Sequence, residues 1–236
     1  MEFVNGERVT SLYHELSPLE RAIQNFEKKA FLYHDKAIKI PANETPQERL
    51  KREQELASAF AHLKNERLHI KTLAQIQQRL DEYRAKAEFM TRKEFRAEKH
   101  HPTRKLAINL RASGRPQPSK NYTAHHIVLG KGRTQGMADA RLLMFLYKIR
   151  INDPDNGAWL PRHKKDKGHW SMPNAPAHSE IHGHNYEIWI TALTQTAMNE
   201  HAFRAALLRI RCMLRDGRQP PQVTQPKKSE WDGLTV

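Results

Sequence analysis

The feature that most constrains this fold is a stretch from Gln47 to His101 that contains neither glycine nor proline. Apolar residues recur along it at spacings of three, four or seven: Leu56, Phe60, Leu63, Ile70, Leu73, Ile76, Leu80, Tyr83 and Ala87. This periodicity predicts a long amphipathic helix, either continuous or broken once into a hairpin. The mixed charges at its other positions favour a solvated face over a nucleic-acid site.

Two capping boxes predict where helices begin in this part of the chain. Ser17-Pro-Leu-Glu20 and Thr45-Pro-Gln-Glu48 each combine an N-cap hydroxyl, a proline at the first helical position and a glutamate at the third. We expect one helix from the first box to about Ile38 and the long helix from the second box. Residues 1–101 are therefore expected to form a helical N-terminal region.

The rest of the chain mixes short strand patterns with helical ones. Residues 102–120 have no periodicity and contain two prolines close together, which is typical of a linker. Within residues 121–216 we expect strands at 122–129 and 158–161, and helices at 137–149, 178–195 and 200–214. The tail, residues 217–236, is expected to be disordered. The predicted fold class is α+β and mostly helical.

Charge points to a polyanionic partner. The chain has 236 residues and a net charge of +14, with a balance of +3 in residues 1–100 and +11 in residues 101–236. A basic surface binds DNA or RNA because each neutralised phosphate releases condensed counterions. The alternative is that the basicity merely aids solubility. The length suits one catalytic domain with an appended element.

Several classes of protein are excluded by what the sequence lacks. No run approaches eighteen consecutive apolar residues, so no membrane span is expected. The first residues lack the basic and apolar order of a secretory signal peptide, so we expect the protein in the cytoplasm of its producer unless a dedicated system exports it. Cys212 is the single cysteine, which leaves histidine and oxygen as possible metal ligands.

Two pairs of adjacent histidines occur, whereas chance gives about one in a chain with this histidine content. His100-His101 ends a charged helical stretch, and we interpret this pair as a solvated surface feature. His125-His126 lies in a predicted strand that leads into a glycine turn. Because neighbouring side chains of a strand point to opposite faces, one imidazole could bind a metal while the other addresses a substrate water.

A second histidine motif follows later in the chain. His178 and His182 stand four residues apart on a predicted helix, which puts both imidazoles on one face. That spacing suits two ligands of one metal ion. His184 would point away from His182 on an ideal helix and is a poor third ligand.

Four blocks in order resemble the AHH family, a branch of the HNH or ββα-metal endonucleases that often occurs as toxin domains in bacterial secretion systems. The blocks are Ala124-His125-His126-Ile-Val, Ala140-Arg141-Leu-Leu, Ile151-Asn152 with Asn156-Gly157-Ala-Trp-Leu-Pro161, and His178-Ser-Glu-Ile-His182 with Tyr186. They cover residues 122 to about 195. The resemblance implies a C-terminal ββα-metal nuclease domain and says nothing about residues 1–100.

The resemblance also assigns roles to single residues. His125 resembles the metal ligand from the first strand, and His126 resembles the general base that activates water. His182 resembles the ligand from the helix, with His178 as an additional ligand; His163 or His169 in the place of His178 is the alternative. Asn156 resembles the middle asparagine that braces the loop and helps orient the base; a simple Asn-Gly turn is the alternative.

One divalent ion is implied as the cofactor. An imidazole-rich site favours Zn, Ni or Mn, although the abundance of Mg in cells could make it the working ion. Arg141, Arg162, Lys164 and Lys165 flank the blocks as candidate phosphate contacts. A helix-surface salt bridge is the alternative for Arg141, and an ordinary solvated loop is the alternative for the others.

We therefore expect a metal-dependent endonuclease that hydrolyses DNA phosphodiester bonds with little sequence preference. The resemblance further implies that the protein is an antibacterial toxin. Such a toxin would be delivered into the target-cell cytoplasm, for example by type VI secretion, and would be neutralised in its producer by an immunity protein. Residues 1–101 would then dock onto a secretion-system carrier or chaperone. The alternatives are an RNase on the same scaffold, and a basic DNA-binding or adaptor protein without catalysis.

Overall fold

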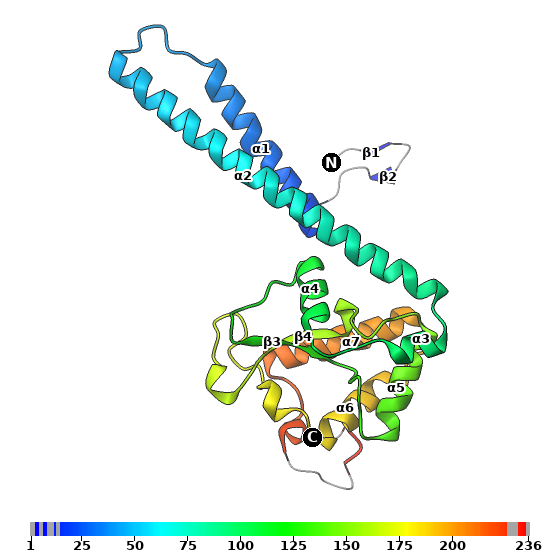
Figure 1. The fold of residues 1–236 in the computed structure, drawn as a ribbon. Helices are drawn as coiled ribbons and strands as arrows, with labels where there is room; N and C mark the ends of the chain where they lie inside the picture. The colour runs from blue at the N-terminus through cyan, green and yellow to red at the C-terminus, as the bar shows by residue number, and fades with distance from the viewer. Residues whose placement is uncertain (1–2, 5–6, 9–11, 13–14, 226–230, 235–236) are drawn as a thin grey trace. The chain divides into compact units, whose positions relative to one another are not determined.

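The computed structural model describes residues 3–4, 7–8, 12, 15–225 and 231–234 (Figure 1). The chain divides into two compact units, residues 1–79 and residues 80–236. The second unit therefore begins well before residue 102, where we placed the end of the N-terminal region. Among the described residues, no helix combines the length and the apolar character needed to cross a lipid bilayer.

The first unit is built mainly from two helices. Strands β1 (Phe3–Val4) and β2 (Glu7–Arg8) pair antiparallel, and helix α1 (Pro18–Ile38) follows. Ser17 caps α1 as its capping box predicts, with reciprocal hydrogen bonds to Glu20. Helix α2 (Pro46–Ala85) begins in this unit and ends in the second. It is continuous, so the hairpin alternative is wrong, and it ends sooner than the pattern to residue 101 suggested.

The second unit is a small two-stranded sheet surrounded by helices (Figure 1). The α-helices are α3 (Arg92–Ala97), α4 (Arg104–Ala112), α5 (Gln135–Leu146), α6 (His184–Thr194) and α7 (Glu200–Asp216). The 3₁₀ turns are η1 (Lys86–Phe89), η2 (Pro154–Asn156), η3 (Lys164–Asp166), η4 (His178–Glu180) and η5 (Pro221–Thr224). The strands are β3 (Tyr122–His126) and β4 (Gly157–Pro161). The fold class is α+β and mostly helical, as predicted.

The two strands pair antiparallel and lie between two apolar clusters. His125 stands opposite Ala158, and His126 stands opposite Gly157. The larger cluster joins buried residues of α5, α6 and α7, and the smaller joins α4 to the strands through Leu106, Leu110, Tyr122, Ala124, Trp159, Met172 and Ala175. Burial on both sides fixes the register of the pair, because a shift of one residue would turn every inward side chain outward.

The expected linker contains a structural helix. Residues 102–120 include α4, whose Leu106 and Leu110 are fully buried against the sheet. A Cβ atom at Gly157 would lie 2.9 Å from both leucine side chains, so glycine is needed for this close approach. The helix was missed because it spans only two and a half turns and a Gly/Pro-rich segment follows it.

The C-terminal tail is ordered over its described part, in contrast to the expected disorder. Val223 of η5 is fully buried, and the Asn185 side chain donates a hydrogen bond of 2.8 Å to the Gln222 carbonyl. Trp231 packs against the larger cluster. These apolar anchors are isolated in a polar sequence, so composition alone hides them. Residues 226–230 and 235–236 lie outside the described residues.

Candidate active site

Strand β3 places His125 and His126 inside the second unit. Both are buried, with 1% and 4% of their surface exposed. Their side chains meet different neighbours, as the alternation of a strand requires. Both nevertheless line one cavity of about 130 Å³, together with His100, His101, His178 and His182. One strand thus brings two imidazoles in different environments to a single cavity.

Three imidazoles at this cavity could together hold a metal ion. One ring nitrogen from each of His125, His178 and His182 lies within 4.8 Å of the others. The Nε2 atoms of His178 and His182 are 2.8 Å apart, and these two rings lie 5.1 and 5.4 Å from the His125 ring, centroid to centroid. The fold therefore brings together the three residues that the sequence predicted as ligands.

The local structure that positions His178 and His182 differs from the expected helix. Residues 178–180 form the 3₁₀ turn η4, and α6 begins only at His184 with Gly183 as its N-cap. Glycine disfavours a helix interior, which explains why the helix does not extend back to His178. The buried Ile181 anchors the segment between the two histidines. The two rings are close because of this turn, not because they share a face of one α-helix.

The surroundings of His125 leave one of its nitrogens available to a metal. The Tyr186 hydroxyl donates its proton to the Ile127 carbonyl at 2.9 Å, so it must accept from His125 Nε2 at 2.8 Å. His125 Nδ1 then carries the lone pair, and it is buried without a hydrogen-bond partner among the described residues. A buried, unpaired nitrogen is unfavourable unless something binds it, so the site fits a metal ion.

Charge at the cluster also suits metal ligation. Burial, followed by the charge of neighbouring imidazoles, lowers the pKa of His125 well below its ordinary range and that of His178 to about 4. Burial likewise lowers the pKa of His182. All three rings are therefore neutral at pH 7, which is the form of histidine that binds metals.

His126 is held in one tautomer by Asn152. The Asn152 amide nitrogen donates to Glu98 Oε1 at 3.2 Å and to the Lys99 carbonyl at 3.0 Å, so its Oδ1 must face His126. Oδ1 lies 3.1 Å from His126 Nε2, which is therefore the protonated nitrogen. His126 Nδ1 remains as the nitrogen that can accept a proton. Burial lowers the pKa of His126 to about 4, so this ring is also neutral at pH 7.

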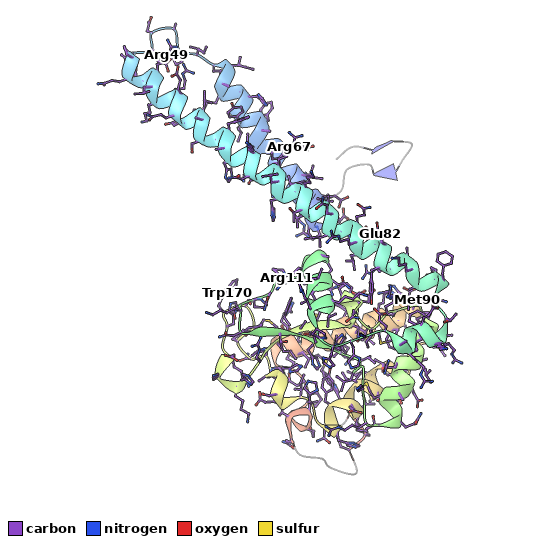
Figure 2. All side chains as sticks on the ribbon, viewed as in Figure 1. Arg49, Arg67, Glu82, Met90, Arg111 and Trp170 are labelled. Atoms are coloured by element: carbon purple, nitrogen blue, oxygen red, sulfur yellow. The ribbon has the colours of Figure 1, made fainter. Side chains whose placement is uncertain are left out.

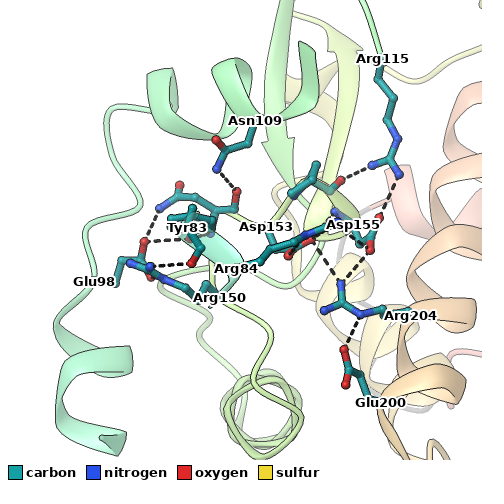
Figure 3. A network of polar contacts seen from close by, with 12 residues as sticks. Tyr83, Arg84, Glu98, Asn109, Arg115, Arg150, Asp153, Asp155, Glu200 and Arg204 are labelled. Atoms are coloured by element: carbon teal, nitrogen blue, oxygen red, sulfur yellow. Dashed lines mark hydrogen bonds and ion pairs between the residues drawn. The ribbon is translucent and has the colours of Figure 1, made fainter. Parts of the chain in front are cut away.

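Glu98 anchors this arrangement from outside the motif blocks (Figure 3). It pairs with Arg150 at 2.9 Å and accepts a hydrogen bond of 2.9 Å from the Tyr83 hydroxyl. Burial raises the pKa of Glu98, but the contact with Arg150 outweighs it and the pKa lies below its ordinary value. Glu98 is thus an anion that fixes the Asn152 amide, which in turn fixes His126.

Asn156, predicted to brace the loop and help orient the base, is fully buried beneath the end of β3. Its Oδ1 accepts from the Val128 amide at 2.8 Å, and its Nδ2 donates to the carbonyls of Val128 and Ile151. It therefore braces the loop and makes no hydrogen bond to His126 among the described residues. The direct contact is made by Asn152, four residues earlier, which sequence reasoning quoted within a block but did not single out.

His100 and His101 both line the cavity. His101 is exposed, as expected of a solvated surface feature, whereas His100 is half-buried, so that interpretation is wrong for His100. Their ring centroids lie 6.1 and 6.3 Å from that of His126. A Cβ atom at Gly130 would lie 2.3 Å from the His100 ring, so this ring sits directly on the glycine turn after β3. Only the tertiary fold reveals this contact, because the local sequence reads as the end of a charged helix.

The candidate phosphate contacts differ in their surroundings. Arg141 is half-buried and donates to the Gly130 carbonyl, so it supports the glycine turn. Arg162, Lys164 and Lys165 are exposed in the loop that follows β4. Lys164 lies 3.7 Å from Glu180 of η4, which connects this loop to the turn that carries His178. Trp170, later in the loop, is 86% exposed (Figure 2).

Comparison with known proteins identifies the domain. Residues 106–206 match a family described as AHH, a nuclease family of the HNH/ENDO VII superfamily with conserved AHH. No curated protein and no solved structure gives a match to the chain. In this sequence the motif is Ala124-His125-His126, on the strand that leads into the cavity. Residues 106–206 are thus a nuclease domain of the AHH family.

Proposed function

We propose that this protein is a metal-dependent endonuclease that hydrolyses DNA phosphodiester bonds with little sequence preference. The observation that carries the proposal is the pairing, at one cavity, of a three-histidine cluster with a fourth imidazole in a fixed tautomer. The cluster offers a buried nitrogen that lacks a hydrogen-bond partner among the described residues. In the fourth imidazole, the contact of Nε2 with Asn152 leaves Nδ1 as the nitrogen that can accept a proton. Metal binding and proton transfer are the two capacities that hydrolysis of a phosphodiester needs.

His125, His178 and His182 would hold the divalent ion. A bound cation would stabilise the negative charge that develops on the scissile phosphate and the leaving oxygen. Three imidazoles favour Zn, Ni or Mn over Mg, because Mg prefers oxygen ligands. Tyr186 would keep His125 in the ligating tautomer, as outer hydrogen-bond partners of ligating histidines commonly do.

His126 would act as the general base. Its Nδ1 takes a proton from a water molecule, the water oxygen attacks the phosphorus, and the bond to the leaving oxygen breaks. The leaving oxygen is then protonated by solvent. The charge that forms on the His126 ring is stabilised through Nε2, which donates to Asn152 and through it connects to the Glu98 carboxylate. Glu98 and Asn152 would therefore orient the base and offset its charge.

A direct test compares purified wild-type protein with His126→Ala and with His201→Ala, a control at an exposed histidine of α7. Plasmid DNA and total RNA are incubated with each protein in EDTA, and then with Zn, Mn, Ni or Mg restored. We expect metal-dependent cleavage of DNA by the wild type and the control, and none by His126→Ala. Cleavage confined to RNA would select the RNase alternative, and full activity of His126→Ala would sink the proposal.

We further propose that the nuclease serves as an antibacterial toxin, with an immunity protein in the producing cell and delivery by a dedicated secretion system. The support is the match of residues 106–206 to the AHH nuclease family, a resemblance that implies a toxin domain, and the basic charge of residues 101–236, which suits chromosomal DNA. Expression in bacteria tests the idea, with chromosomal integrity as the readout. Wild-type protein should fragment the chromosome, and folded His126→Ala should leave it intact. Growth without damage in the wild-type strain would contradict a toxic role.

A further inference from the structure

We propose that Arg96, Lys99 and Lys131, with His100 and His101, form a groove that binds the phosphate backbone of the nucleic acid and leads it into the metal cavity. The inference rests on the proposed nuclease function and names the surface that holds the substrate. The cations with a free charge in this groove differ from those predicted from the sequence, which lie elsewhere on the same unit.

The geometry is that of two adjoining cavities. The first, of about 130 Å³, contains the metal cluster and His126. The second, of about 310 Å³, is lined by residues 96–101 and Lys131. His100, His101 and Lys131 line both cavities, so the two adjoin each other at these side chains. A chain of phosphates in the second cavity would therefore reach the catalytic imidazoles.

The charges in the groove lack protein partners. Arg96, Lys99 and Lys131 are exposed, and within the described part of the chain none of them has an ion pair. Glu98, the carboxylate that lines the second cavity, already pairs with Arg150 and Lys105. By contrast, Lys164 and Lys167 of the loop after β4 both lie near Glu180. The groove therefore offers positive charge that only a ligand can neutralise.

The groove is also fixed relative to the catalytic base. The Lys99 carbonyl accepts from the same Asn152 amide that orients His126, and the His100 ring sits on Gly130. Nε2 of His100 is buried and has no hydrogen-bond partner among the described residues, so it could donate to a phosphate oxygen or its water. A phosphate held by Lys99 and Lys131 would thus be placed with little freedom against His126.

The positive charges of the groove change the pKa of neighbouring groups. Burial is the main cause of the lowered pKa of His100, and the charges of His101, Arg141 and Lys131 lower it further. Arg96 adds to the effect of burial on the pKa of Arg141. Positive charges that destabilise one another in this way gain most from a polyanion. The phosphate backbone of DNA carries the required negative charge.

Three triple variants, each losing three positive charges, test the groove. The groove variant is Arg96→Ala/Lys99→Ala/Lys131→Ala. The control, Arg92→Ala/Lys93→Ala/Lys120→Ala, removes exposed cations that line neither cavity. The loop variant is Lys164→Ala/Lys165→Ala/Lys167→Ala. Each variant also carries His126→Ala, so that the DNA is not cleaved. Binding to labelled duplex DNA is measured in EDTA by fluorescence anisotropy, at KCl concentrations from roughly 50 to 250 mM, where phosphate contacts dominate the affinity.

The slope of log affinity against log salt counts the phosphates neutralised, at about 0.9 for each contact. We expect the groove variant to reduce the slope by about 2 to 3 and the affinity at low salt by roughly 10-fold or more. The control variant should change affinity by about 2-fold at most, through its net charge alone. Zn²⁺ affinity should equal that of the His126→Ala parent in all three variants, since none of the lysine and arginine substitutions alters a residue of the metal cluster.

A groove variant that keeps the slope of the control would overturn the proposal, and so would loss of slope confined to the loop variant. The nuclease function is judged separately, with His126 intact. If the wild type and the triple variants with His126 intact cleave no nucleic acid in the presence of any of the metals, the proposed function fails. If the wild type cleaves DNA and the groove variant binds DNA like the control variant, only the proposal about the groove is wrong. All the substituted lysines and arginines are exposed, and circular dichroism checks that the variants remain folded.

Discussion

Tyr186→Phe is the sharpest test of how this site prepares a metal ligand. The substitution removes one oxygen from a fully buried ring and changes little else in the packing. It deletes the hydrogen bond to His125 Nε2 and the one to the Ile127 carbonyl. His125 is then free to place its proton on Nδ1, where it would block ligation. Metal affinity should therefore fall even though no ligand is altered.

Tyr186→Phe should have two separate effects, one on the stability of the apoprotein and one on metal affinity. Loss of hydrogen bonds to buried groups should lower the free energy of unfolding of the apoprotein by about 1 to 3 kcal/mol. Loss of a partner that orients a ligating histidine typically weakens metal binding by about 10- to 100-fold. At a fixed metal concentration well above Kd, that weakening removes a further ~1.4 to 2.7 kcal/mol of metal-induced stabilisation. The second effect appears only when metal is present.

Calorimetric titration with Zn²⁺ and Mn²⁺ gives the affinity, and thermal melts with and without metal give the stability. Tyr147→Phe is the matched control, because its hydroxyl donates to the Ala197 carbonyl at 2.7 Å, away from the cavity. The control should lose stability by about 1 kcal/mol equally with and without metal. Should Tyr186→Phe bind both metals as tightly as the wild type, Tyr186 does not set the tautomer of His125, and the derived role of its Nδ1 is wrong.

Three further outcomes follow from the same geometry. Asn152→Ala should lower kcat by roughly 10²- to 10⁴-fold in single-turnover cleavage while Zn²⁺ affinity stays constant, because the base loses its orientation and the ligands do not; a loss of less than about 3-fold would refute this role. In EDTA, the free energy of unfolding should fall as pH drops from about 6.5 towards 4. The pKa of His126 is about 4 in the folded protein, so protonation favours the unfolded chain, by about 2 kcal/mol at pH 5 relative to pH 8. Urea titrations at several pH values measure it, and a flat profile would contradict it. A fragment of residues 80–236 should fold and cleave, whereas residues 106–236 should lose cooperative thermal unfolding; an active, folded shorter fragment would show that residues 80–105 are dispensable.

The sequence predicts best those features that depend on neighbouring residues. The capping box at Ser17 starts a helix where expected, and the alternation within β3 separates His125 from His126. The closeness of His178 and His182 was predicted for the wrong reason, since Gly183 stops the helix that was expected to carry them. His182 lies beyond the 3₁₀ turn, so its closeness to His178 follows from the bend of residues 181–183 and not from a helical period.

What the sequence could not give are the contacts between distant segments. Glu98 and Asn152 are 54 residues apart, and their hydrogen bond is invisible to any local pattern. Asn152 and Asn156 were equally good candidates in one turn-rich loop, and only the fold shows that the first faces His126. The interpretation of His100 failed for the same reason, because the His100 ring packs on Gly130, which follows the distant pair His125-His126 in the chain.

These distant contacts also change where the nuclease begins. The family match starts at residue 106, but the compact unit starts at Leu80. Between these points lie Arg84, which pairs with Asp153 at 3.0 Å, and Glu98, which fixes the amide behind the base (Figure 3). Both interactions reach the loop that precedes β4. The ion pair at Asp153 and the hydrogen bond of the adjacent Asn152 to Glu98 hold the same point of that loop, and Asn152 in turn contacts His126. We therefore expect the segment before the family domain to belong to the candidate active site, and substitutions there to affect catalysis as those within the motif do.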